Sequence, residues 1–210
     1  MFQQITGINT VIYFAPQIFQ AAGLSSASVS ILATAGVGAV NVALTLVSIR
    51  LIDQLGRRTL LLWSLGGMAG TLLVLAGGFA FGASGATAWI TVLSVAAYVA
   101  FFAVGLGPVF WLLIAEIFPL AVRGRAMSLA TISNWGFNLL VTVTFLGLIE
   151  LCGRTGTFLL YAVLTLAAVA FTAVLVPETK GRSLEEIEDA LEGQSRPAPA
   201  AASTATRRAA

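Results

Sequence analysis

Long apolar runs separated by short polar segments make up most of the chain. Six of them can be marked, at residues 2–22, 29–52, 60–81, 88–118, 126–151 and 157–176. About 20 apolar residues in a helix, each rising 1.5 Å, cross the hydrocarbon core of a bilayer. The pattern therefore predicts an all-α membrane protein with six transmembrane helices. The composition agrees, because 58% of the residues are hydrophobic and 10% are charged, against about 25% charged in an average soluble domain.

Breaks are expected within the first and the fourth of these runs. Gly105, Gly107 and Pro108 interrupt the fourth run, which is long, so we expect a bent or locally unwound helix there. Gly7 offers a similar break in the first run. Interrupted helices at corresponding places in two triplets are typical of transporters built from two inverted three-helix repeats.

The basic residues predict the orientation in the membrane. Ten of the eleven follow the second, fourth or sixth run, and Arg154 alone lies on the other side. Loops rich in Lys and Arg stay in the cytoplasm, so we expect a multi-pass protein with a cytoplasmic C-terminus. Six crossings place the N-terminus there too. The chain nevertheless opens with Met1 and Phe2 and has no basic anchor, so we expect the first helix to be truncated.

The segment after Pro177 is predicted to contain a short cytoplasmic helix. Ser183 and Glu186 form a capping box, and Leu184, Ile187 and Leu191 would give the helix one apolar face. Beyond residue 193 the chain is too poor in large apolar residues to fold. The expected organisation is a bundle over 1–176, a cytoplasmic motif and helix over 177–192, and a disordered tail over 193–210.

Several polar side chains fall inside the apolar runs, where an unpaired amide costs several kcal/mol. They are Gln3, Gln4, Asn9, Asn41, Asn134 and Asn138. One interpretation is hydrogen bonding between helices, but their clustering favours a ligand site. Trp135 directly follows Asn134, and Trp111 lies four residues after Gly107 in the interrupted fourth run. A flat indole stacks well on a sugar ring. The alternative for these tryptophans is an ordinary place at the membrane interface.

Two charged clusters repeat at helix ends. Asp53, Arg57 and Arg58 follow the second run, and Glu116 and Arg123 follow the fourth. Cross-pairing between them could clamp the bundle on its cytoplasmic side. Anchoring by the positive-inside rule would explain the arginines alone, but an unpaired Glu116 at an apolar helix end would be costly, so a partner is expected.

Histidine is absent and Cys152 is the only cysteine. The chain therefore lacks the commonest general base and transition-metal ligand and any intrachain disulfide, which weakens the case for an enzyme. We expect no cofactor and no metal site, and no nucleic acid among the partners.

Five motifs resemble those of the sugar porter branch of the major facilitator superfamily, over residues 3 to about 189. They are Gln3-Gln4-Ile-Thr-Gly7-Ile8-Asn9, Asp53-x-x-Gly56-Arg57-Arg58, Gly107-Pro108-Val-Phe-Trp111, Ala115-Glu116-Ile-Phe-Pro119 and Pro177-Glu178-Thr-Lys-Gly-Arg-Ser183. In that family these belong to helices seven to twelve of a twelve-helix transporter. The resemblance implies the C-terminal half of a protein that moves a monosaccharide across the cell membrane by alternating access.

The resemblance also implies roles for particular residues. Those expected to contact the sugar are Gln3, Gln4, Asn9, Tyr13, Asn41, Trp111, Asn134, Trp135 and Asn138. Those expected in a gating network of salt bridges are Asp53, Arg57, Arg58, Glu116, Arg123 and Glu178. Ala103 stands where facilitative animal members have a glutamate, as in many proton-coupled bacterial members, and this favours symport. The acid that such symporters use lies in the first helix, so symport and facilitation both stay open, as does a membrane scaffold that transports nothing.

Overall fold

A computed structural model describes residues 1–24, 26–82 and 85–181, and the secondary structure within these ranges is entirely α-helical. The predicted helix near residues 184–191 and the predicted tail over 193–210 lie outside the described residues. The helices are α1 (Phe2–Ile5), α2 (Ile8–Tyr13), α3 (Ala15–Ala21), α4 (Ala27–Leu55), α5 (Arg57–Ala80), α6 (Gly85–Val104), α7 (Leu106–Ile117) and α8 (Leu120–Leu175). The prediction of an all-α membrane fold is confirmed.

The first apolar run forms a broken rod of three short helices. Gly7 separates α1 from α2 with a φ of 87°, in the left-handed region that favours glycine. This is the break that the sequence predicted. A second break at Phe14 was not predicted, although Pro16 in the first turn of α3 explains why a new helix starts there.

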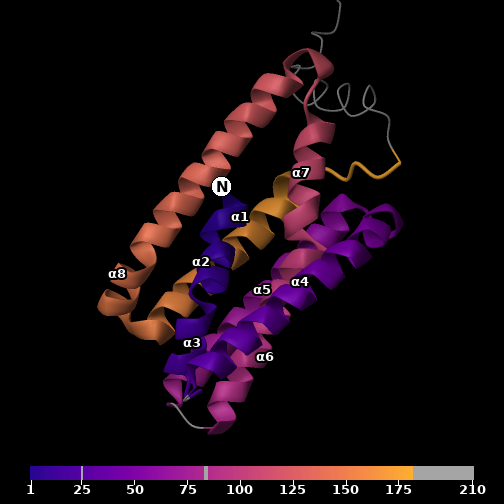
Figure 1. Ribbon diagram of the computed structural model, residues 1–210. Helices are drawn as coiled ribbons and strands as arrows, with labels where there is room; N and C mark the ends of the chain where they lie inside the picture. The colour runs from indigo at the N-terminus through magenta and orange to yellow at the C-terminus, as the bar shows by residue number, and fades with distance from the viewer. Residues whose placement is uncertain (25, 83–84, 182–210) are drawn as a thin grey trace, which may run out of the picture.

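The fourth run is also broken, and the last two runs are joined. Gly105 separates α6 from α7, as expected. Within α8, Gly153 alone leaves the helical region, with φ 69° and ψ 172°, so α8 consists of two arms, residues 120–152 and 154–175. Figure 1 shows these arms leading away from the turn in a V, with α1 and α2 beside them.

The loops are shorter than the sequence predicted. The expected loop over 119–125 is helical from Leu120 onward, the expected loop over 152–156 shrinks to Gly153, and the charged link over 53–58 shrinks to Gly56. Arginine is a good helix former, so charged residues extend the helix ends instead of ending them. Sequence patterns mark the apolar part of a span better than the end of its helix.

The helices pack around one apolar core and leave a wide apolar outer surface. α5 packs against α6 and α8, and the core includes Phe19, Leu65, Met68 and Phe158. Large apolar side chains are exposed on the outside; Trp63, for example, is 72% exposed. Among the described residues, the stretches long and apolar enough to cross a membrane are Ala27–Leu55, Arg57–Ala80, Ala86–Ile117 and Val122–Leu175. The last of these contains both arms of α8.

Candidate functional site

The break at Gly7 brings two polar side chains of the first rod into contact. In a continuous helix, side chains five residues apart would point about 140° away from each other. In the structure the Asn9 Nδ2 donates to Gln4 Oε1 at 2.9 Å, and Asn9 Nδ2 also donates to Asn138 Oδ1 at 3.1 Å. The left-handed glycine therefore turns two groups on separate helix faces into one polar cluster.

The amides continue into a directed chain that crosses the bundle. Gln4 Nε2 donates to Asn134 Oδ1 at 2.8 Å, and Asn134 Nδ2 donates to Gln3 Oε1 at 2.6 Å. Gln3 Nε2 in turn donates to the carbonyls of Leu106 and Gly107, both at 3.2 Å. Those two carbonyls lie just after the break at Gly105 between α6 and α7, and a carbonyl oxygen can only accept a hydrogen bond.

The two backbone carbonyls fix the orientation of every amide in this chain. Gln3 must direct its NH₂ at them, so its oxygen faces Asn134, which must donate. Asn134 then offers its oxygen to Gln4, whose own oxygen receives Asn9. Both N–H groups of Asn9 are used, so the group that it has left to offer is its oxygen.

This polar chain lies along one side of a cavity of about 390 Å³. The residues that line the cavity are Gln3, Gln4, Asn9, Asn41, Thr45, Phe102, Ala103, Gly107, Pro108, Trp111, Asn134 and Trp135. Trp111 and Trp135 are 37% and 58% exposed, so both indoles present a face for contact. No charged side chain is among these described lining residues. The cavity combines uncharged donors, uncharged acceptors and flat apolar surfaces.

Seven of the nine residues predicted to bind a ligand line this cavity, and the other two do not. Asn138 is buried and is not among the lining residues, and its oxygen accepts from Asn9 at 3.1 Å and from Thr142 at 3.4 Å. Tyr13 is 51% exposed and is not among the lining residues. Tyr13 follows the break at Gly7 and ends α2, so its direction could not be read from a regular helix.

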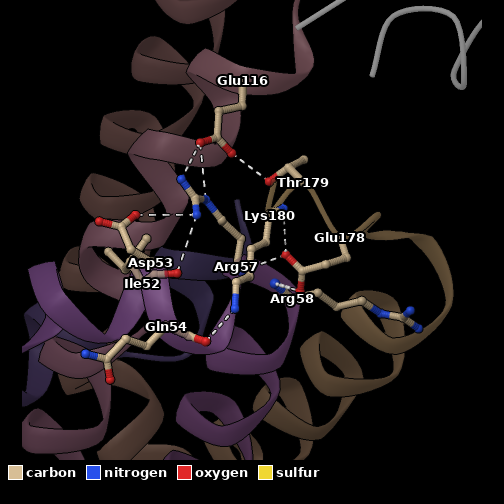
Figure 2. A network of polar contacts seen from close by, with 9 residues as sticks. All are labelled: Ile52, Asp53, Gln54, Arg57, Arg58, Glu116, Glu178, Thr179 and Lys180. Atoms are coloured by element: carbon tan, nitrogen blue, oxygen red, sulfur yellow. Dashed lines mark hydrogen bonds and ion pairs between the residues drawn. The ribbon is translucent and has the colours of Figure 1, made fainter. Parts of the chain in front are cut away.

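A second polar cluster joins the ends of α4, α5 and α7 to the segment after α8, as Figure 2 shows. The Arg57 Nη2 and Nε donate to Glu116 Oε1 at 2.9 and 3.2 Å. The other oxygen of Glu116 accepts from the Thr179 hydroxyl at 2.6 Å. The side chains of Arg57 and Glu116 are 14% and 17% exposed. The two charged clusters identified in the sequence are thus joined by one partly buried ion pair.

Glu178 contacts backbone rather than an arginine side chain, which differs from the expected salt bridge. Its carboxylate accepts the N–H groups of Arg57 at 2.9 Å, Arg58 at 3.1 Å and Lys180 at 3.1 Å. Arg57 and Arg58 open α5, so Glu178 supplies a negative charge and two acceptors to the helix N-terminus. Gly56 makes room for it, because a Cβ there would lie 2.7 Å from Glu178 Oε2.

The other predicted members of this network contribute less to it. Asp53 reaches Arg57 at 3.7 Å, but its side chain is 78% exposed. Arg58 donates to the carbonyl of Ala173, and Arg123 donates to the carbonyl of Phe118 at 3.1 Å. Within the described residues neither arginine is ion-paired with a carboxylate. Both bind helix-end carbonyls, which no charge pattern would have distinguished from salt bridging.

Sequence reasoning missed Thr179 and Lys180. Lys180 Nζ donates to the carbonyl of Gln54 at 2.6 Å, near the end of α4. Both residues belong to the motif that begins at Pro177, and Pro177 ends the helical pattern there. Their place directly beside Glu178 was the available signal that the whole segment folds back onto α4 and α5.

Comparison with known proteins gives a consistent result. The family model described as "Sugar (and other) transporter" matches residues 1–191. The chain is 42% identical over 198 residues to a probable metabolite transport protein, CsbC, of Bacillus subtilis, covering 91% of this chain and 41% of that protein. It is 38% identical over 192 residues to a D-xylose transporter of Levilactobacillus brevis, covering 91% and 42%.

A solved structure shares the fold. The structure of the proton:xylose symporter XylE, a major facilitator superfamily protein, bound to 6-bromo-6-deoxy-D-glucose superposes with a TM-score of 0.80. The sequences are 36% identical, and the match covers 90% of this chain and 40% of XylE. The chain thus spans about two fifths of the length of the relatives it matches. Because the family model matches most of its residues, the chain belongs to the sugar transporter family.

Proposed function

We propose that this chain forms one half of a secondary transporter that binds a monosaccharide in the amide-lined cavity and moves it across the cell membrane by alternating access. The directed amide chain is the observation that carries the proposal. Its polarity leaves an acceptor at Asn9, while Gln4 and Asn134 each use only one of their two N–H groups within the part of the chain that the structure describes. A sugar hydroxyl both donates and accepts, so it suits such a mixed set.

The apolar and uncharged character of the cavity supports a neutral ring as the ligand. The indoles of Trp111 and Trp135 offer faces on which the C–H side of a pyranose stacks. A charged ligand would find no counter-ion among the described lining residues and would lose its hydration without compensation. D-xylose and D-glucose are therefore reasonable first ligands, because one relative is a D-xylose transporter and the XylE structure contains 6-bromo-6-deoxy-D-glucose.

We propose six membrane crossings in this half: the α1–α3 rod, α4, α5, the α6–α7 rod and the two arms of α8. A second six-helix half would cover the open side of the cavity, and the 41% coverage of a relative is consistent with this. The positive-inside pattern supports a cytoplasmic C-terminus. Proton coupling is proposed from the symporters among the relatives, and the coupling carboxylate is assigned to the other half.

The charged network is proposed as a clamp that favours one state of the transport cycle. Arg57 and Glu116 connect the start of α5 with the end of α7, and α7 belongs to the broken rod that lines the cavity. Opening the bundle on this side would separate the pair, because the two residues come from different helices. The difference in the free energy of this ion pair between the closed and the opened state would determine how far it shifts the equilibrium between those states.

The test is calorimetry of the purified chain in lipid nanodiscs, titrated with D-xylose, D-glucose and, as a charged comparison, glucose 6-phosphate. We expect a neutral sugar to bind and the phosphate ester to bind far more weakly. Asn9→Ala and Gln4→Ala should each weaken binding by about 1–3 kcal/mol, since partner groups would be left unsatisfied. That is about 5- to 140-fold in Kd.

Gln20→Ala provides the matched control, because Gln20 is an exposed amide on α3 outside the cavity. Its Kd should equal that of the unmodified chain. A folded helical chain that binds neither sugar would contradict the proposal and favour a scaffold without transport. Equal affinities in all three variants would remove Asn9 and Gln4 from the binding site.

A further inference from the structure

The break between α6 and α7 leaves backbone groups that lack their normal helical partners. Pro108 has no N–H, so the carbonyl of Val104 has lost the donor that a continuous helix would supply. The Ser48 hydroxyl, from α4, donates to this carbonyl at 2.5 Å. A hydroxyl from a neighbouring helix thus replaces the missing bond.

A second hydroxyl, from a different helix, binds the same break. Ser64, from α5, accepts the N–H of Leu106 at 3.0 Å and donates to the carbonyl of Phe101 at 2.7 Å. Ser64 is 2% exposed, and a Cβ on Gly105 would lie 2.4 Å from Ser64 Cβ. The glycine is therefore required for Ser64 to approach the break.

The break in the first rod has an equivalent partner. Tyr98, from α6, donates its hydroxyl to the carbonyl of Thr6 at 2.7 Å. Thr6 and Tyr98 are both 0% exposed, and among the described residues no backbone N–H reaches this carbonyl. Without Tyr98 a buried carbonyl would be left unpaired.

We propose that Ser48, Ser64 and Tyr98, here called the break hydroxyls, are positioning residues for the sugar site. This inference rests on the proposed function. The break at Gly7 lies between Gln4 and Asn9 and lets them meet. The break at Gly105 presents the carbonyls of Leu106 and Gly107 to Gln3 and so fixes the direction of the amide chain. The break hydroxyls hold both geometries without touching the ligand.

Loss of one break hydroxyl should move the backbone, because a buried unpaired group seeks a new partner. In Ser64→Ala the N–H of Leu106 would turn back toward the carbonyl of Phe102, its partner in a continuous helix. That movement would straighten the α6–α7 rod and carry the carbonyl of Gly107 away from Gln3. In Tyr98→Phe the carbonyl of Thr6 would turn, and the contact between Asn9 and Gln4 would loosen.

The chain contains matched controls for both changes. Tyr161 is a tyrosine as buried as Tyr98, at 2% exposed, and its ring lies against Gly7. Its hydroxyl lies near the Thr10 hydroxyl, but neither makes a hydrogen bond of normal geometry among the described residues, so Tyr161→Phe removes no bond that holds a break. Ser30 is 0% exposed, but it donates to Ser26 within its own segment at 3.1 Å, so Ser30→Ala leaves the breaks intact.

The experiment is calorimetric titration of the chain and these four variants with whichever of D-xylose or D-glucose binds the unmodified chain. The fitted Kd describes the folded molecules, whereas the fitted stoichiometry reports the fraction that is folded. We expect Ser64→Ala and Tyr98→Phe each to raise Kd by about fivefold or more. Tyr161→Phe and Ser30→Ala should leave Kd unchanged. A purely structural role would lower the stoichiometry and keep Kd constant.

Sugar binding by the unmodified chain with equal Kd values in all variants would overturn this inference and leave the proposed function standing. Failure of the unmodified chain to bind any tested sugar would overturn both. If Ser64→Ala does not yield folded protein, Tyr98→Phe and Ser48→Ala decide the result by the same criterion. The double variant with both Ser64→Ala and Tyr98→Phe should have a higher Kd than either single variant, since different hydroxyls hold the two breaks.

Discussion

Replacing Gly56 by alanine should destabilise the chain through two separable effects. Gly56 has φ 87° and ψ 160°, a region that is nearly restricted to glycine and costs about 1–3 kcal/mol for other residues. The new Cβ would also lie 2.7 Å from Oε2 and 2.8 Å from the carboxyl carbon of Glu178. The carboxylate must therefore move away from the N–H groups of Arg57 and Arg58 that it accepts.

The size of the second effect follows from the hydrogen bonds at risk. A hydrogen bond to a charged group contributes about 1.5–3 kcal/mol, and the bonds to Arg57 and Arg58 measure 2.9 and 3.1 Å. Losing one of them brings the total cost of Gly56→Ala to about 2.5–6 kcal/mol. In a Glu178→Ala background the obstacle is gone, so Gly56→Ala should cost only the strain of about 1–3 kcal/mol.

The assay is a double-mutant cycle, with the free energy of unfolding measured in mixed detergent micelles. The coupling energy between the two positions should reach about 1.5–3 kcal/mol. Gly82→Ala is the control, because Gly82 also has a positive φ, 89°, but a Cβ there would meet nothing within 4 Å. Additive costs at Gly56 and Glu178, within about 0.5 kcal/mol, would refute the reasoning.

Three further predictions concern the break, the clamp and transport. Gly7→Ala should destabilise the chain by about 2–5 kcal/mol, because Gly7 has a φ of 87° and a Cβ there would lie 2.6 Å from the ring of Tyr161. In the control Gly66→Ala the new Cβ meets nothing within 4 Å, so its stability should not change. Equal melting temperatures for the two variants would contradict this prediction. In the complete transporter, Glu116→Gln should shift the population of states more than Arg123→Ala, which loses only a bond to the carbonyl of Phe118; identical cysteine labelling at either mouth would argue against a clamp. Proteoliposomes that contain this chain alone should not accumulate labelled sugar on an inward proton gradient, because alternating access needs two halves around one site; accumulation above equilibrium would disprove that requirement.

The fold class, the two main breaks and most of the cavity residues could be predicted from the sequence. Lipid imposes a length and a composition on each span, and glycine with proline marks the places where a helix is interrupted. Amides within apolar runs stand out because burial is costly without partners. Those signals are local, so a single sequence carries them.

The partners of the polar groups could not be predicted. Glu178 was expected to pair with an arginine side chain, but it accepts backbone N–H groups at the start of α5, more than a hundred positions away along the chain. Likewise, nothing in the pattern around Ser64 indicates that its hydroxyl bridges the broken rod. Such bonds depend on how α5 packs against α6 and α7, which spacing within one helix does not specify.

The turn at Gly153 has a consequence for how the protein enters the membrane. A single non-helical residue joins the two arms of α8, so, in the proposed arrangement of six crossings, almost no chain separates the end of one crossing from the start of the next. Both ends of such a hairpin would stay on one side of the membrane, and its tip, with Glu150 and Arg154 nearby in the sequence, would have to cross the bilayer. We therefore expect the two arms of α8 to enter the bilayer together as one helical hairpin.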